Sequence, residues 1–396
     1  MVVERRPPVM ADVARAAGVS HQTVSRVLNN HPNVRPATRA KVLEAIDRLG
    51  YRRNQVARAL ATRNTRTLGV VSFDTTLYGP ASTLHGIERA ARAAGYFVSI
   101  VSLRTVDRDG VREAIDHLAE QGVAGVVVVA PQRSAASALE DLPPGMPAVA
   151  VEGGHAGPVS VVCVDQVAGA RLATEHLLAL GHETVWHVSG PPDWLEAEGR
   201  VEGWRAALTA AGRPVPEPLP GDWSPRSGYA AGRRLAALAD RVGAVFVAND
   251  QMALGVLRAL TEAGVRVPEQ MSVVGFDDIP ESEFFSPPLT TVRQDFGAVG
   301  RHSLDVLMRQ IAGRGDGAPP PGPERLVVPP TLVPRASTAP PGGAAPRLAV
   351  PDGAPARTPR RTPERAPEST PESSPESSPD SDPPADVRVR PPSRRR

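Results

Sequence analysis

Several polar side chains stand directly after apolar, strand-like runs of the chain, where they could bind a ligand. Glu152 follows PAVAV, Asn249 follows AVFVA and Asp277 follows SVVGF. Parallel α/β sheets bind ligands beyond the carboxyl ends of their strands, so these positions are expected to line a site. Carboxylates and amides suit a saccharide, because each sugar hydroxyl both donates and accepts a hydrogen bond. An aromatic ring, offered by Trp223 or Phe296, suits the apolar face of a sugar.

Three further carboxylates also follow apolar runs, namely Asp165, Asp250 and Asp278. Asp250 and Asp278 could equally cap the helices that follow them, because a carboxylate at a helix N-terminus accepts backbone N–H groups. A role in ligand binding and a role in capping therefore both stay open for these two residues.

A second group of polar residues lies in DVARAAGVSHQTVSRVLN, residues 12–29, and its spacing predicts a helix-turn-helix. Ala14, Gly18 and Val24 stand at i, i+4 and i+10, as two short helices need when they cross at a tight turn. Ser20 is placed to cap the second helix. The side chains that would then face the major groove are His21, Gln22, Thr23, Ser25 and Arg26. An ordinary helical hairpin with a polar face is the alternative.

Charge is distributed unevenly along the 396 residues. The net charge is only +2, but residues 1–66 carry thirteen basic and four acidic side chains, which leaves the remainder net acidic. A basic N-terminal segment followed by a larger acidic region is typical of a phosphate-binding module attached to a larger domain. No apolar run resembles a secretory signal or a membrane span, so we expect a cytoplasmic protein with no membrane partner.

The sequence offers little for catalysis or for cofactors. It contains one lysine, Lys41, and shows no G-x-G-x-x-G turn, phosphate-binding loop or G-x-S-x-G elbow. Cys163 is the single cysteine, which excludes an intramolecular disulfide, and the nine histidines lack metal-binding spacing. We therefore expect no enzyme activity, no metal and no cofactor.

Apolar strand-like runs alternate with helical periodicity after residue 66. TLGVVS, YFVSIVS and AGVVVVA are β-branched runs typical of strands buried on both faces, and helical patterns such as REAIDHLAEQG separate them. This alternation predicts an α/β core of two parallel-sheet lobes behind an all-α N-terminal domain. Residues 336–396 are rich in Pro and Ser, and we expect them to form a disordered tail.

Three segments carry a family resemblance: VSHQTVSRVLNN, YRRNQVARAL and VANDQMALGVLRALTEAG. They resemble the LacI/GalR family of bacterial transcription regulators, and the similarity runs from about residue 9 to residue 334. The resemblance implies a periplasmic-binding-protein-like core and the following domains: helix-turn-helix 9–53, hinge helix and linker 54–66, effector core 67–335, with an N-lobe of about 67–164 and 294–325 and a C-lobe of about 165–292 and 326–335.

The resemblance also implies how DNA is bound. Two hinge helices would pair over the minor groove of double-stranded operator DNA, and each would insert Leu60 as a wedge. The implied DNA contacts are His21, Gln22, Thr23, Ser25, Arg26, Asn29, Arg39, Asn54, Ala57 and Leu60. The tail contains no apolar heptads, so we expect a homodimer and not a tetramer. The tail's terminal Arg cluster could attract DNA weakly or do nothing.

The implied effector is a sugar or glycoside, and its binding would release a repressor from genes of carbohydrate use. The positions implied to contact it are Tyr78, Glu152, Arg200, Trp223, Asn249, Asp277, Gln294 and Phe296. Two alternatives stay open. The effector could be a purine or a phosphorylated metabolite, which could also act as a corepressor. The protein could instead be a sugar-binding transport protein, which would have no use for the helix-turn-helix.

Overall fold

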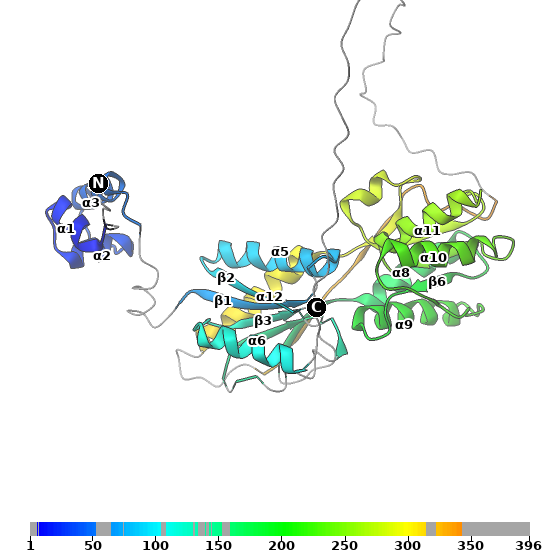
Figure 1. Ribbon diagram of the computed structural model, residues 1–396, viewed down its shortest axis with the longest axis horizontal. Helices are drawn as coiled ribbons and strands as arrows, with labels where there is room; N and C mark the ends of the chain where they lie inside the picture. The colour runs from blue at the N-terminus through cyan, green and yellow to red at the C-terminus, as the bar shows by residue number, and fades with distance from the viewer. Residues whose placement is uncertain are drawn as a thin grey trace, which may run out of the picture. The chain divides into compact units, whose positions relative to one another are not determined.

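The computed structural model describes most of the N-terminal domain and of the α/β core (Figure 1). The residues described are 6, 8–52, 65–73, 75–103, 108–129, 131–133, 139, 142–143, 145–152, 159–313 and 322–342. The predicted hinge contacts of Asn54, Ala57 and Leu60 lie outside these residues, and so does the predicted tail from residue 343 onward.

The N-terminal domain is a three-helix unit with its own apolar core, as predicted. Its helices are α1 (Met10–Ala17), α2 (His21–Leu28) and α3 (Pro36–Leu49). Val13, Val24 and Val42 are fully buried between them. Gly18 adopts a φ of 65° at the turn, a left-handed conformation that other residues adopt at a cost. Ser20 caps α2, because its side chain accepts a hydrogen bond from the Thr23 backbone N–H at 3.2 Å.

The first sheet of the core contains only parallel strands, in the order β11-β5-β4-β3-β1-β2. The strands are β1 (Thr67–Phe73), β2 (Phe97–Leu103), β3 (Val126–Val129), β4 (Ala148–Val151), β5 (Ser160–Val164) and β11 (Arg325–Val328). Alternate side chains of β3 and β4 enter apolar clusters on opposite faces of the sheet. One cluster includes α5 (Tyr78–Ala93) and α12 (Phe296–Gly313), and the other includes α6 (Arg108–Glu120).

The second sheet has the order β12-β10-β9-β8-β6-β7 and is parallel except for β12. Its strands are β6 (Trp186–Ser189), β7 (Leu219–Pro220), β8 (Ala244–Val247), β9 (Ser272–Asp277), β10 (Thr290–Arg293) and β12 (Thr331–Val333). Helices α8 (Gln166–Ala179) and α9 (Leu195–Ala210) cover one face, and α10 (Pro225–Ala236) and α11 (Asp250–Glu262) cover the other. A 3₁₀ helix, η2 (Pro280–Phe284), follows β9. The predicted two-lobed α/β core is thus confirmed (Figure 1).

The chain crosses to the second lobe a few residues after the approximate boundary predicted near Arg325. Leu326 to Val328 belong to β11, which pairs with β5 in the first sheet, and the chain reaches the second sheet only at β12. The RLVV run is a short apolar strand whose hydrogen bonds to β5 extend past the boundary inferred from the resemblance. Residues 326–328 therefore belong to the N-lobe.

The predicted start of the tail at residue 336 is also wrong. Ala336, Ser337, Thr338 and Ala339 are buried against the second sheet. The backbone N–H of Ala336 donates to the carbonyl of Pro288, and the N–H of Val273 donates to the carbonyl of Ser337. Small side chains let this segment lie close to β9 and β10, although its composition is that of a linker. The core thus extends through these residues.

None of the described helices combines the length and the apolar character needed to cross a membrane.

Candidate functional site

The residues of α2 that are predicted to read bases lie on the face of the helix that points away from the domain core. Val24 and Val27 are buried, which orients the helix. His21, Gln22, Arg26 and Asn29 are exposed, whereas Thr23 and Ser25 are partly buried. The hydroxyls of Thr23 and Ser20 lie 2.9 Å apart, so Thr23 also supports the helix cap. The helix therefore presents a polar, donor-rich face of the kind that reads bases.

Arg39 connects α3 to the end of α2. Its guanidinium donates to the side-chain oxygen of Asn30 at 2.7 Å and to the carbonyl of His31 at 2.9 Å. These bonds hold the segment that follows the reading helix. Arg39 thus has a positioning role beside the DNA contact predicted for it.

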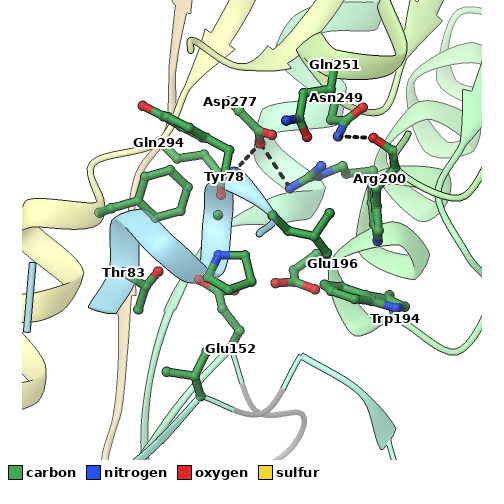
Figure 2. A pocket seen from close by; sticks show the side chains of 16 residues that line it. Tyr78, Thr83, Glu152, Trp194, Glu196, Arg200, Asn249, Gln251, Asp277 and Gln294 are labelled. Atoms are coloured by element: carbon green, nitrogen blue, oxygen red, sulfur yellow. Dashed lines mark hydrogen bonds and ion pairs between the residues drawn. The ribbon is translucent and has the colours of Figure 1, made fainter. Parts of the chain in front are cut away.

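All eight residues predicted to contact an effector line one solvent-connected cavity, whose empty volume is about 520 Å³ when the open space at its mouth is included. It is bounded by side chains of both lobes (Figure 2). The residues that line it are Leu77, Tyr78, Gly79, Pro80, Thr83, Val129, Glu152, Trp194, Glu196, Arg200, Trp223, Asn249, Gln251, Asp277, Gln294 and Phe296. The carboxyl ends of β4 and β9 and the first residues of α5 and α12 bring them together. This arrangement is the one expected for parallel sheets.

Arg200 is the buried cation of the cavity. Its Nε donates to Gln166 at 2.9 Å, one terminal nitrogen donates to the carbonyl of Ala248 at 2.5 Å, and the other lies 3.6 Å from the carboxylate of Asp277. The guanidinium also lies 4.0 Å from the ring centroid of Phe276. These contacts fix its position before any ligand binds, because each removes a rotamer choice.

A chain of hydrogen bonds joins the acidic residues of the two lobes. Gln294 donates to Asp277 at 2.7 Å, and Gln166 donates to Gln294 at 2.9 Å and to Glu152 at 3.4 Å. The other oxygen of Glu152 accepts the backbone N–H of Val164 at 3.2 Å. Dashed lines in Figure 2 mark the bonds to Asp277. A ligand that displaces one member of this chain perturbs the others.

Burial raises the pKa values of the cavity carboxyl groups. The pKa of Asp277 rises to about 6 because the group is desolvated, although Arg200 opposes the rise. Desolvation also raises the pKa of Glu152 to about 7, with the N–H of Val164 and Arg200 acting in the opposite direction. The pKa of Glu196 lies well above its usual value, because of burial first and the charge of Glu152 second.

Two pairs of aromatic rings enclose the cavity. Trp194 and Trp223 meet edge to face with ring centroids 5.5 Å apart, and Tyr78 and Phe296 do the same at 5.9 Å. The indole N–H of Trp223 is buried and has no hydrogen-bond partner among the described residues. Such rings offer apolar faces for a ligand, and the N–H offers a donor.

Three of the cavity residues hold strained backbone conformations. Glu152, Trp223 and Asp277 have φ values of 60°, 72° and 107°, in the region that favours glycine. Strain of this kind concentrates at functional sites, where the surrounding structure maintains it. Here the strained backbone directs the side chains of these three residues toward the cavity.

The carboxylates whose roles stayed open in the sequence are structural. Asp250 accepts hydrogen bonds from the Thr291 hydroxyl at 2.6 Å and from the Ile279 N–H at 2.9 Å, and burial raises its pKa. Asp278 bonds Arg293 and Arg335, which lower its pKa despite the opposing effect of burial. Asp165 caps α8. None of the three lines the cavity.

Asn249 has two roles. Its side-chain oxygen caps α11 by accepting the N–H of Met252 at 2.8 Å, and its nitrogen donates to the carbonyl of Trp223 at 3.2 Å. It therefore holds the Trp223 backbone in place as well as lining the cavity.

Sequence reasoning missed Trp194 and Glu196. Both lie at the start of α9, after a loop and not after a strand, so the pattern of polar residues behind apolar runs could not find them. The rarity of tryptophan, with four in the chain, was the one available signal for Trp194.

A three-helix DNA-reading unit and a two-lobed core with a ligand cavity define a ligand-responsive transcription regulator. One family model, "Bacterial regulatory proteins, lacI family", matches residues 9–54, and another, "Periplasmic binding protein-like domain", matches residues 174–338. The chain belongs to the lacI family of bacterial regulatory proteins. This confirms the family resemblance seen in its sequence.

The similarity covers most of the chain. The lactose operon repressor of Escherichia coli K12 is 37% identical over 314 residues, which cover 78% of this chain and 86% of that protein. The HTH-type transcriptional regulator CelR of Thermobifida fusca is 36% identical over 325 residues, covering 78% and 93%. These curated relatives are regulators and not enzymes.

Solved structures agree with this assignment. The lac repressor dimer bound to operator and the anti-inducer ONPF has a TM-score of 0.75 at 34% identity, covering 84% of this chain and 100% of that one. A complex of CelR with cellobiose has a TM-score of 0.62 at 34% identity, covering 83% and 99%.

Proposed function

We propose that the protein is a homodimeric repressor of carbohydrate-utilisation genes, and that a saccharide or glycoside bound in the cavity releases it from operator DNA. The observation that carries this proposal is the cavity itself, where two aromatic pairs face a set of fixed polar groups. A sugar requires aromatic rings that pack against its apolar face and polar side chains that form hydrogen bonds with its hydroxyls.

The charge of the cavity favours a saccharide over a phosphorylated metabolite. Among the described lining residues, three are carboxylic acids, Glu152, Glu196 and Asp277, and one is a cation, Arg200. Arg200 is already paired with Asp277. A phosphate group would add negative charge to a site that has no free cation among these residues, at a considerable desolvation cost.

The dimer is proposed from exposed apolar side chains of the core. Phe97 and Ile100 on the edge strand β2 are 59% and 48% exposed, and Phe284 in η2 is 80% exposed. Large apolar groups of this kind on an edge strand are covered in most stable proteins.

Phe97→Asp should therefore disturb the proposed dimer. Sedimentation velocity should show a shift toward monomer, and operator binding should weaken.

Release from DNA requires the cavity and the DNA-binding surface to be coupled. We propose that the effector stabilises one arrangement of the two lobes, and that this arrangement does not support the hinge contacts predicted for Asn54, Ala57 and Leu60. An effector that binds this arrangement more tightly by about 2–3 kcal/mol weakens operator binding by roughly 30- to 150-fold.

The test is an operator-release experiment on the full chain. A preferred duplex is first selected from a random library, and its binding is then followed by fluorescence anisotropy while a panel of glucosides, galactosides and disaccharides is added. At least one saccharide should release the duplex, and Trp223→Ala should abolish release without abolishing DNA binding. If no saccharide binds or releases, the proposed effector class is wrong.

A further inference from the structure

Glu152 and Glu196 face the same part of the cavity from different lobes (Figure 2). Glu152 follows β4 of the N-lobe and is 8% exposed, and Glu196 belongs to the first turn of α9 in the C-lobe. One carboxylate oxygen of Glu196, Oε2, is buried and has no hydrogen-bond partner among the described residues. A buried carboxylate oxygen without a donor is costly, so its position indicates that a ligand supplies the donor.

The opposite carboxylate is also incompletely bonded. Among the described residues, Oε2 of Glu152 has one hydrogen-bond partner, the amide nitrogen of Gln166 at 3.4 Å, near the upper limit for a hydrogen bond. An ionised carboxylate can accept about four hydrogen bonds, so each member of this pair retains capacity for donors. Both residues line the cavity.

The charge of the pair is only partly compensated within the cavity, because desolvation raises the pKa values of both carboxyl groups more than Arg200 lowers them. Arg200 forms an ion pair with Asp277 and donates its other bonds to Gln166 and Ala248. The charge of Arg325 also lowers the pKa of Glu152, but Arg325 is exposed and solvent screens its charge. Two neighbouring carboxylates therefore need either a bound proton or a cation from the ligand.

We propose that the effector is a saccharide that carries a protonated amine, and that its ammonium group lies between Glu152 and Glu196. This inference rests on the proposed function and narrows its ligand class to amino sugars. An ammonium has three donors and one positive charge, so it bonds both carboxylates and reduces their repulsion, whereas a sugar hydroxyl offers one donor and no charge.

The raised pKa values agree with this geometry. Desolvation and the neighbouring carboxyl raise the pKa of Glu196, and desolvation raises that of Glu152 to about 7. A cation between the two groups would favour their ionised forms, so amine binding should release protons near neutral pH.

The experiment is calorimetric titration of the full-length protein with matched sugars. The probes are glucosamine and galactosamine, each beside its N-acetyl derivative and its parent hexose, together with the disaccharides of glucosamine, N-acetylglucosamine and glucose. The amine of the preferred series should bind at least 10-fold more tightly than both neutral analogues. Its binding heat should also depend on the ionisation enthalpy of the buffer, because protons are released.

Variants locate the amine. Glu196→Gln keeps the shape of the side chain and should reduce the amine preference to about 1-fold, and Glu152→Gln should do the same. The matched control is Glu198→Gln, because Glu198 lies two residues further along α9, pairs with Arg133 and does not line this cavity. That control should keep the 10-fold preference.

Each outcome decides between the two proposals. Equal or weaker binding of the amine by the wild-type protein overturns the inference and leaves the saccharide proposal standing. An amine preference that survives both Glu→Gln variants overturns the placement of the ammonium. Failure of every sugar to bind overturns the proposed function, and the present inference fails with it.

Discussion

Arg200 and Asp277 form a buried ion pair whose partners depend on one another. Arg200→Met removes the cation and keeps most of the side-chain volume, so Asp277 is left buried without its charge partner. We expect the pKa of Asp277 to rise further above its present value of about 6 and the unfolding free energy of the core to fall by about 3 kcal/mol. Urea unfolding at pH 7.5, followed by tryptophan fluorescence, measures the change.

The control for this prediction is the double variant Arg200→Met with Asp277→Asn. An amide has no charge to neutralise, so the double variant should recover a large part of the lost stability. Equal losses in the single and double variants would show that packing of Arg200 against Phe276, and not its charge, accounts for the effect.

Glu152 makes the stability of the unliganded core depend on pH. Burial raises its pKa from 4.5 to about 7, so the folded state binds the proton more tightly than the unfolded state does. Its contribution therefore falls as the pH rises from about 4.5 to about 7 and is constant above that. Each pKa unit is equivalent to about 1.4 kcal/mol, so a rise from 4.5 to about 7 gives a full effect on the order of 3 kcal/mol.

Glu152→Gln should remove this dependence. The difference in unfolding free energy between the variant and the wild type should move in favour of the variant between pH 5 and pH 7.5, as measured by urea unfolding in matched buffers. Parallel stability curves for the two proteins over that range would contradict the raised pKa.

Individual site residues could be predicted from the sequence only where a local pattern marked them. Glu152, Asn249 and Asp277 follow apolar strands, and the sequence therefore placed them at the cavity. Asp250 carries the same signal but points into the core, because Thr291 and the backbone of Ile279 lie on that side. Glu196 has no strand before it, and only the folded chain places it opposite Glu152.

At the scale of elements, the crossing of α5 and α12 sets the N-lobe wall of the cavity. Each helix has a glycine at the crossing: a Cβ atom on Gly86 would lie 2.5 Å from the carbonyl oxygen of Phe296, and one on Gly300 would lie 2.3 Å from the backbone of Gly86. Backbones this close leave no room for a side chain. Tyr78 and Phe296, at the starts of the two helices, meet because of this approach.

Gly86→Ala should therefore separate α5 from α12. We expect a loss of about 1–3 kcal/mol in unfolding free energy, as for other overpacked sites, and weaker binding of the effector. Gly313→Ala, at the last residue of α12, is the matched control, because no atom lies within 4 Å of its added Cβ. Urea unfolding should find the control within about 0.5 kcal/mol of wild type, and similar losses in both variants would contradict the crossing argument.

Elements with strong local patterns could be predicted, and those that depend on distant partners could not. The β-branched runs of β1, β3 and β9 marked buried strands directly. The approximate lobe boundary near residue 325 falls within β11, because a run of four residues does not say which sheet it joins. Its partner β5 lies more than 150 residues earlier in the chain.

For the whole molecule, the two lobes are joined where the hydrogen-bond chain of the cavity runs. Gln166 stands just after the first crossing of the chain between the sheets, and Gln294 stands at the second. Each bonds the other, and together they connect Glu152 of one lobe to Asp277 of the other. A ligand that bonds either acid therefore acts on the segments that join the two lobes, which supports the proposed coupling to DNA release.

Two truncations test whether residues 336–342 belong to the folded core. Ending the chain after Arg335 removes Ser337, whose hydroxyl accepts the Thr290 N–H at 2.8 Å and donates to the carbonyl of Val273 at 2.6 Å. It also removes Ala339, whose carbonyl bonds His182. Unpaired buried groups cost about 1–3 kcal/mol each, so the melting temperature should fall by roughly 10 °C.

Ending the chain after Gly342 keeps these contacts, and differential scanning calorimetry should find its melting temperature within about 2 °C of the full chain. Ser337→Ala in the full chain should give an intermediate loss, because it removes the hydroxyl bonds and leaves the backbone pairing with Val273 in place. The two truncations thus separate the packed segment from the residues that follow it. Equal melting temperatures for both would mean that 336–342 contributes nothing and that the core ends, as its composition suggested, at Arg335.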